Sequence, residues 1–270
     1  MNGSAAEPPP RYVRARDGTP IACWGAGSGP PLLLVHGAMS DHRRWRIRSR
    51  LEPHRTVHVM DRRGRGMSGD GAEWSVDLEV DDVVAVVEAL SEDAAAPVDV
   101  LGHSFGGALC LRAAARSRSV GRLVLYEPAL NEPPVSARIL QRMDALLAEG
   151  RLEETVELMM REVVLIPESE IVVLRAQPAW PARVATAPTL PREVANLITW
   201  RPDEGADVQV PTLLIQGADS PAFVREATEL VASSLPDARV VVLEGQQHVA
   251  DQIVPDVFAD VVLDFLLGRG

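Results

Sequence analysis

The chain has 270 residues, of which 46% are hydrophobic and 24% charged, and its 38 acidic side chains against 27 basic ones give a net charge of −11. All the basic residues are arginines, so a Schiff-base lysine, a pyridoxal-phosphate anchor and a P-loop lysine are excluded. The negative charge argues against a nucleic acid or an anionic membrane as the main partner, and two cysteines are too few for a disulfide framework or a cysteine-rich zinc site.

Residues 1–10 lack the apolar core of a secretory signal, and no apolar run approaches the roughly 18 residues that a membrane span needs. We therefore expect residues 1–10 to be a disordered lead-in and the protein to be cytoplasmic, with no membrane partner. Cys23 and Cys110 are interpreted as small buried side chains. A monomer or a homodimer is expected.

Predicted strands and helices alternate over residues 11–129, as in the core of an α/β protein. The first feature is a hairpin at Asp17-Gly18, between the extended runs 12–16 and 21–24. Continuous apolar runs then predict buried strands, and apolar residues at helical spacing predict the helices between them. The strands cover residues 32–35, 56–60, 98–101 and 123–126, and the helices cover residues 78–90 and 105–116.

The alternation stops over residues 130–207, which we interpret as a helical cap inserted into the core. Apolar spacing predicts helices over 135–148 and 152–164, and a stretch rich in proline and alanine follows, with Trp180 and Trp200. The core resumes over residues 208–270, with strands at 212–216 and 239–243 and helices at 221–235 and 255–267. Such an alternation implies a mostly parallel central sheet with helices on both faces.

The pattern Gly102-x-Ser104-x-Gly106 lies between a predicted buried strand and a predicted helix. In this context the pattern predicts a nucleophile elbow, a tight turn that exposes the serine hydroxyl at its apex. The positive end of the following helix favours an anion that develops there. We therefore predict Ser104 as a nucleophile, and the alternative is an ordinary glycine-rich turn.

Three other motifs accompany this elbow: His-Gly-Ala at 36–38, Asp-Arg-Arg-Gly-Arg-Gly-Met-Ser at 61–68, and Gly-Gln-Gln-His at 245–248. Together the four motifs resemble the α/β-hydrolase superfamily, in its esterase and lipase-like branch with a small helical cap. The resemblance covers about residues 20–130 and 207–270. It implies the α/β-hydrolase fold and a cofactor-free serine hydrolase, with no metal. It also implies an oxyanion hole made by the backbone N–H groups of Ala38 and Phe105.

A serine nucleophile needs a base, and among six histidines His248 alone follows the final predicted strand. This position completes the chain order Ser, acid, His of the fold. In the superfamily that the chain resembles, the acid commonly lies in a G-x-x-D turn after the strand that corresponds to 212–216, but that position is Ser220 here, and Asp219 comes one residue early. A second known placement is the end of the preceding strand, where Glu127 stands. Either carboxylate could orient His248, and the register favours Glu127.

The candidate substrate pocket consists of His36, Met39, Met143, Met159 and Trp180. Methionine and aromatic side chains form an adaptable apolar surface, and a net charge of −11 repels anions. We expect a neutral, partly apolar small molecule as the substrate, and hydrolysis of a carboxylic ester or lactone as the reaction. The alternatives are a carbon–carbon bond hydrolase or a perhydrolase with the same triad, and a non-catalytic receptor or cyclisation-assisting protein.

Overall fold

The computed structural model describes residues 8–131, 133, 135–196 and 198–269. Most of the predicted lead-in, residues 1–7, therefore lies outside the described residues, and the carbonyl of Pro8 accepts a hydrogen bond from Trp24 Nε1 at 3.0 Å. None of the described helices combines the length and the apolarity that crossing a bilayer requires.

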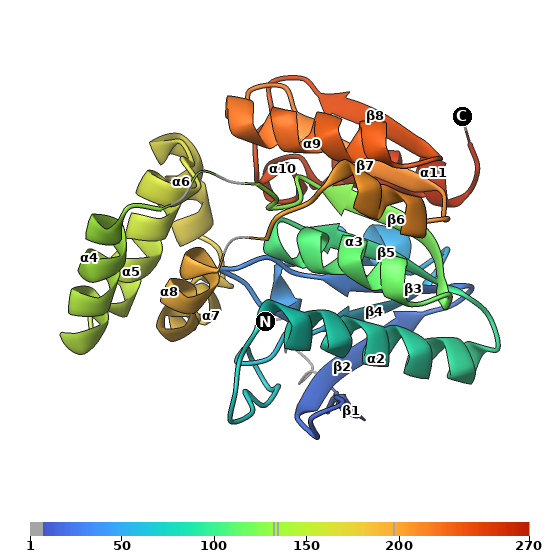
Figure 1. Cartoon of the computed structure of the whole chain (residues 1–270), viewed down its shortest axis with the longest axis horizontal. Helices are drawn as coiled ribbons and strands as arrows, with labels where there is room; N and C mark the ends of the chain where they lie inside the picture. Colours follow the sequence, from blue (N-terminus) through green and yellow to red (C-terminus); the bar gives the residue numbers. More distant parts are fainter. Residues whose placement is uncertain (1–7, 132, 134, 197, 270) are drawn as a thin grey trace, which may run out of the picture.

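A twisted eight-stranded sheet forms the centre of the described chain, in the order β1-β2-β4-β3-β5-β6-β7-β8 (Figure 1). Its strands are β1 (Arg11–Arg14), β2 (Pro20–Gly27), β3 (Pro31–Val35), β4 (Thr56–Met60), β5 (Val98–His103), β6 (Val120–Tyr126), β7 (Thr212–Gly217) and β8 (Ala238–Leu243). β1 pairs antiparallel with β2, which confirms the predicted hairpin, and β2 also pairs antiparallel with β4. All other pairs are parallel, as predicted.

Helices cover both faces of this sheet, because successive residues of the central strands point to opposite sides. Leu33 and Val35 of β3 pack in one hydrophobic cluster, and Leu32 and Leu34 pack in the other. The first cluster lies under α2 (Val76–Ala94), α3 (Phe105–Arg116) and α9 (Ala222–Ser234), and the second under α1 (Arg48–Leu51), α10 (Ala250–Ile253) and α11 (Pro255–Leu266). The chain therefore has the predicted α/β-hydrolase architecture.

A group of short helices stands apart from the sheet, on the left of Figure 1. It consists of α4 (Ala137–Ala148), α5 (Leu152–Leu158), a π-helical turn at Met159–Val163, α6 (Glu168–Arg175), α7 (Trp180–Ala185), a 3-10 turn at Ala187–Thr189 and α8 (Leu190–Ala195). A further 3-10 turn at Pro202–Asp207 leads back to β7. We call α4 to α8 the cap helices.

Three cap helices, α6 to α8, lie in the proline- and alanine-rich stretch where the sequence predicted no helix. Their prolines begin helices here instead of ending them. Pro167 caps α6, and Pro181 and Pro191 lie in the first turns of α7 and α8. Proline fits this first turn because its missing N–H would have no partner there in any case.

Candidate active site

Ser104 lies at a sharp turn between the end of β5 and the start of α3. Its backbone has φ 55° and ψ −125°, a strained conformation for a residue other than glycine. Backbone hydrogen bonds hold the turn: Ser104 N–H donates to Tyr126 O at 2.9 Å, and Ser104 O accepts from Ala129 N–H at 3.0 Å and from Ala108 N–H at 3.1 Å. The strain is therefore fixed by the neighbouring strand, as in a nucleophile elbow.

The two glycines of the elbow allow close packing around this turn. A Cβ atom at Gly106 would lie 2.3 Å from the carbonyl oxygen of His36, and one at Gly102 would lie 2.7 Å from Gly107 Cα. Neither contact is sterically possible, so any larger residue would separate α3 from the strands. The glycines thus bring the first turn of α3 against the loop that follows β3.

This loop, with Ala38 and Met39, borders the same cavity as Ser104 and Phe105. Two buried arginine side chains donate hydrogen bonds to carbonyl groups of this loop. Arg65 donates to Ala38 O from Nε at 3.1 Å and from Nη2 at 2.8 Å, and Arg183 Nη1 donates to Met39 O at 2.9 Å. Ala38 and Phe105, whose N–H groups are expected to form the oxyanion hole, therefore border the same cavity as Ser104, and the carbonyl group of Ala38 is held by Arg65.

His248 follows β8 and also borders the cavity. Its Nδ1 lies 2.7 Å from Oε2 of Glu127, which follows β6 and is 1% exposed. The other oxygen of this carboxylate, Oε1, accepts from Gly217 N–H at 2.7 Å and from Ser220 Oγ at 2.5 Å. With Nδ1 donating to the carboxylate, Nε2 is the ring nitrogen that can accept a proton.

The other candidate acid, Asp219, is exposed, and its backbone N–H donates to Gln246 O at 3.0 Å. The buried Ser220, at the position usual for the acid, turns its hydroxyl to Glu127. The structure therefore brings Glu127 to His248 and leaves Asp219 at the surface.

Buried groups fix the loop that carries His248. Tyr126 donates its hydroxyl to Gln247 O and accepts from Ala250 N–H at 2.8 Å. His103 Nε2 bonds to the carbonyl of His248 at 2.9 Å, and burial, with the positive charge of Arg44 next, holds the pKa of His103 well below its usual range. A neutral His103 is therefore a structural support for this loop.

Of the five predicted pocket residues, Met39 and Met159 line the cavity, whereas three lie elsewhere. His36 is fully buried below the loop, where its Nε2 accepts from a backbone N–H at 3.1 Å. Met143 is buried among the cap helices, and Trp180 donates its indole N–H to a surface glutamate at 3.1 Å. Met143 therefore packs in the core of the cap and does not border the cavity.

Three charged residues that the sequence did not single out also line the cavity: Arg44, Arg183 and Glu193. The rest of the lining is mainly apolar and includes Ala129, Val135, Val163, Val164, Ile166, Val194 and Val249. Arg183 and Glu193 belong to α7 and α8, whose helices the sequence did not predict. No signal in the sequence distinguishes them from the many exposed charges of the cap.

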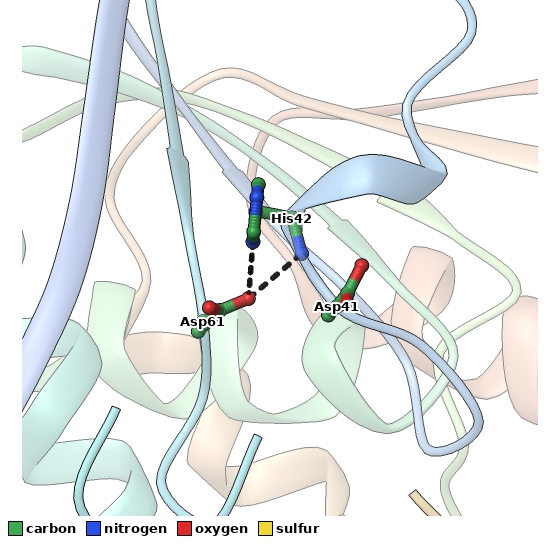
Figure 2. A group of neighbouring side chains, drawn as sticks. All are labelled: Asp41, His42 and Asp61. Atoms are coloured by element: carbon green, nitrogen blue, oxygen red, sulfur yellow. Dashed lines mark hydrogen bonds and ion pairs between the residues drawn. The ribbon is translucent and has the colours of Figure 1, made fainter. Parts of the chain in front are cut away.

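Figure 2 shows Asp41, His42 and Asp61, whose ligand atoms lie within 4.8 Å of one another, a geometry that a metal ion could use. Their oxygen atoms already accept hydrogen bonds within the protein. Asp61 Oδ1 accepts from His42 N–H at 2.9 Å and lies 2.8 Å from His42 Nδ1, and Oδ2 accepts from Met67 N–H at 2.8 Å. Asp41 Oδ1 accepts from Arg43 N–H at 2.9 Å. We interpret this group as a structural contact between the loop that carries Asp41 and His42 and the loop that begins at Asp61.

A sequence model of the alpha/beta hydrolase family matches residues 32–261. The chain belongs to the alpha/beta hydrolase family. The solved structure of an alpha/beta hydrolase from Sphaerobacter thermophilus aligns with 93% of this chain and 100% of its own, at 38% sequence identity and a TM-score of 0.78.

Two relatives with named activities align with different fractions of the chain. Lipase LipV of Mycobacterium tuberculosis is 36% identical over 123 residues, so the match spans 45% of this chain and less than half, 45%, of the lipase. 2-(Acetamidomethylene)succinate hydrolase of Mesorhizobium japonicum is 24% identical over 257 residues and covers 89% of each chain. These matches support hydrolase activity, and the substrate is a separate question.

Proposed function

We propose that this family member is a cofactor-independent serine hydrolase that cleaves a carboxylic ester or lactone through an acyl-enzyme. The observation that carries the proposal is the 2.7 Å bond between His248 Nδ1 and the buried Glu127, at the cavity that Ser104 lines from a strained elbow. In the proposed triad Ser104 is the nucleophile, His248 the base and Glu127 the acid.

The reaction follows from these roles. Ser104 Oγ forms a bond to the substrate carbonyl carbon while its proton passes to His248 Nε2. The backbone N–H groups of Ala38 and Phe105 hold the negative oxygen of the tetrahedral intermediate. When the ester C–O bond breaks, His248 gives the proton to the leaving oxygen. Water then attacks the acyl group with His248 again as base, and the carboxylic acid and free Ser104 are released.

A second candidate bond is an N-acyl bond. It is favoured by the relative named 2-(acetamidomethylene)succinate hydrolase, whose match spans 89% of both chains. The same residues would serve, with His248 giving the proton to a leaving nitrogen. An acyl amide that is cleaved faster than the ester with the same acyl group would favour this candidate.

The experiment that separates an enzyme from a binding protein uses a fluorophosphonate probe, which reacts with activated serines. We expect the probe to label the wild-type protein at Ser104, and p-nitrophenyl acetate to be turned over. Ser104→Ala should abolish both signals, and Ser117→Ala, at a serine outside the pocket, should abolish neither. A folded wild-type protein that resists the probe and turns over no ester would contradict the proposal and favour the receptor alternative.

A further inference from the structure

Arg183 of α7 is a buried cation without an ion-pair partner among the described residues. It is 8% exposed, and the one hydrogen bond that its guanidinium makes to the described part of the chain runs from Nη1 to Met39 O. Burial, with the repulsion of Arg44 next, lowers the pKa of Arg183 to about 10, so the side chain is charged at neutral pH. A buried charge without a partner destabilises a fold, so a bound anionic molecule would compensate the charge of Arg183.

The acids around Arg183 are engaged elsewhere. Asp251 and Asp41 both act on it through space. Both oxygens of Asp251 accept from Arg44 Nη2 at 2.6 Å, and Oδ2 also accepts from Gln252 Nε2 at 2.8 Å. Asp41 Oδ2 accepts from Arg43 Nε at 2.9 Å. Neither carboxylate forms an ion pair with Arg183 in the described part of the chain.

The other charges of the cavity are likewise compensated. Glu193 Oε1 accepts from Arg62 Nη2 at 2.9 Å and from Arg65 Nη2 at 2.5 Å. The carboxylate of Glu127 faces His248 and two donors. Within the described lining, Arg183 is thus the charge whose counter-ion is missing.

We propose that Arg183 binds a carboxylate of the substrate, so that the substrates are esters or lactones that carry a second, free acid group. This inference rests on the proposed function and names its substrate class. A guanidinium presents a planar fork of N–H donors that matches a carboxylate, and Nη1 alone is taken by Met39. Met39 follows Ala38, so the bound carboxylate lies close to the oxyanion hole, and a short carbon chain separates it from the reacting carbonyl.

The expectation of a neutral substrate, drawn from the net charge of −11, is replaced by this local argument. Exposed charges are screened over about 8 Å at physiological ionic strength. A single buried and unpaired guanidinium in the wall of the cavity therefore outweighs the acidic surface in selecting the bound molecule.

The test compares monomethyl and dimethyl esters of butanedioic and pentanedioic acids, with kcat/KM measured by proton release. The wild-type protein should prefer the monomethyl esters at least about tenfold, and Arg183→Gln should lose that preference, because its kcat/KM should fall at least about tenfold further on the monomethyl esters than on the dimethyl esters. Arg142→Gln removes an exposed cap charge and should keep the preference. An equal loss on both ester types would overturn the proposal, because it would mean that Arg183 only positions Met39.

A binding measurement separates this inference from the proposed function, because it needs no turnover. Calorimetry should show that pentanedioate binds to Ser104→Ala protein, that pentanediamide does not, and that the added Arg183→Gln change abolishes the binding. If Arg183→Gln does not fold, as judged by circular dichroism, Arg183→Lys keeps the charge and should bind pentanedioate more weakly. Absence of pentanedioate binding to folded Ser104→Ala protein would overturn the carboxylate site, whereas absence of fluorophosphonate labelling in wild type would overturn the hydrolase.

Discussion

Replacing Glu127 by glutamine changes one atom of the proposed triad in a setting that dictates how the amide must lie. Gly217 N–H and Ser220 Oγ both donate to Oε1, at 2.7 and 2.5 Å, and Oε2 faces His248 Nδ1 at 2.7 Å. Two donors require an acceptor, so the glutamine must turn its carbonyl to them and its amino group to His248. The amino group then donates to Nδ1, and the proton of the neutral ring moves to Nε2.

With the proton on Nε2, His248 cannot accept the proton of Ser104. The corresponding change in a Ser-His-Asp triad lowers kcat about 10⁴-fold. This factor corresponds to about 5 kcal/mol of activation free energy, which is the loss that we expect for Glu127→Gln. Asp219 is exposed, so Asp219→Asn should leave kcat unchanged.

The assay is the steady-state hydrolysis of p-nitrophenyl acetate at pH 7.5 by wild type, Glu127→Gln and Asp219→Asn. Circular dichroism and thermal unfolding establish that each variant is folded. A loss of less than about tenfold in Glu127→Gln would refute the reasoning about the tautomer. A large loss in Asp219→Asn would show that the exposed carboxylate is the acid.

Three further predictions concern stability and accessibility. Glu193→Ala leaves the buried Arg65 without its carboxylate, so urea titration should show a loss of about 3–5 kcal/mol in the free energy of unfolding, and a loss below 1 kcal/mol would contradict the pairing. A hydrogen bond from the backbone N–H of Thr19 is the main reason why the pKa of Asp17 is lowered to about 2, so the ionised carboxylate stabilises the fold. The difference in unfolding free energy between wild type and Asp17→Asn should therefore be present at pH 6 and disappear as the pH falls from about 4 to 2. A difference that does not change with pH would disprove this prediction. Burial raises the pKa of Cys23 to about 12 and also raises that of Cys110, so neither thiol should react with a disulfide reagent at pH 8 until urea unfolds the protein, and rapid reaction of the native protein would show that they are not buried.

The sequence predicted the elements whose signals are local. The hairpin at Asp17, the buried run of β3 and the helix that begins at Phe105 all follow from periodicity and turn residues, and the structure confirms each. The sequence did not predict the helices α6 to α8, because a proline can mark either the end of one element or the start of another. Their existence depends on packing within the cap, which no local pattern reports.

In the candidate site, too, the sequence predicted the residues that have local signals and missed those that depend on tertiary contacts. Motifs located Ser104 and His248, and the register favoured Glu127 over Asp219. Both carboxylates stayed candidates, since the choice depends on a contact between residues 121 positions apart. Arg183 was missed for a related reason. Its importance comes from the absence of an ion-pair partner in the described structure, and a sequence does not show which charges are paired.

The contact between Ser220 and Glu127 has a consequence for the evolution of this family. The ends of β6 and β7 are adjacent, and their two side chains meet at 2.5 Å, one as donor and one as acceptor. A lineage can therefore transfer the negative charge from one strand end to the next by two substitutions, while His248 stays in place. Sequence alignments that score each column independently would record two unrelated losses at this point, although the proposed acid has only moved from one strand end to the next.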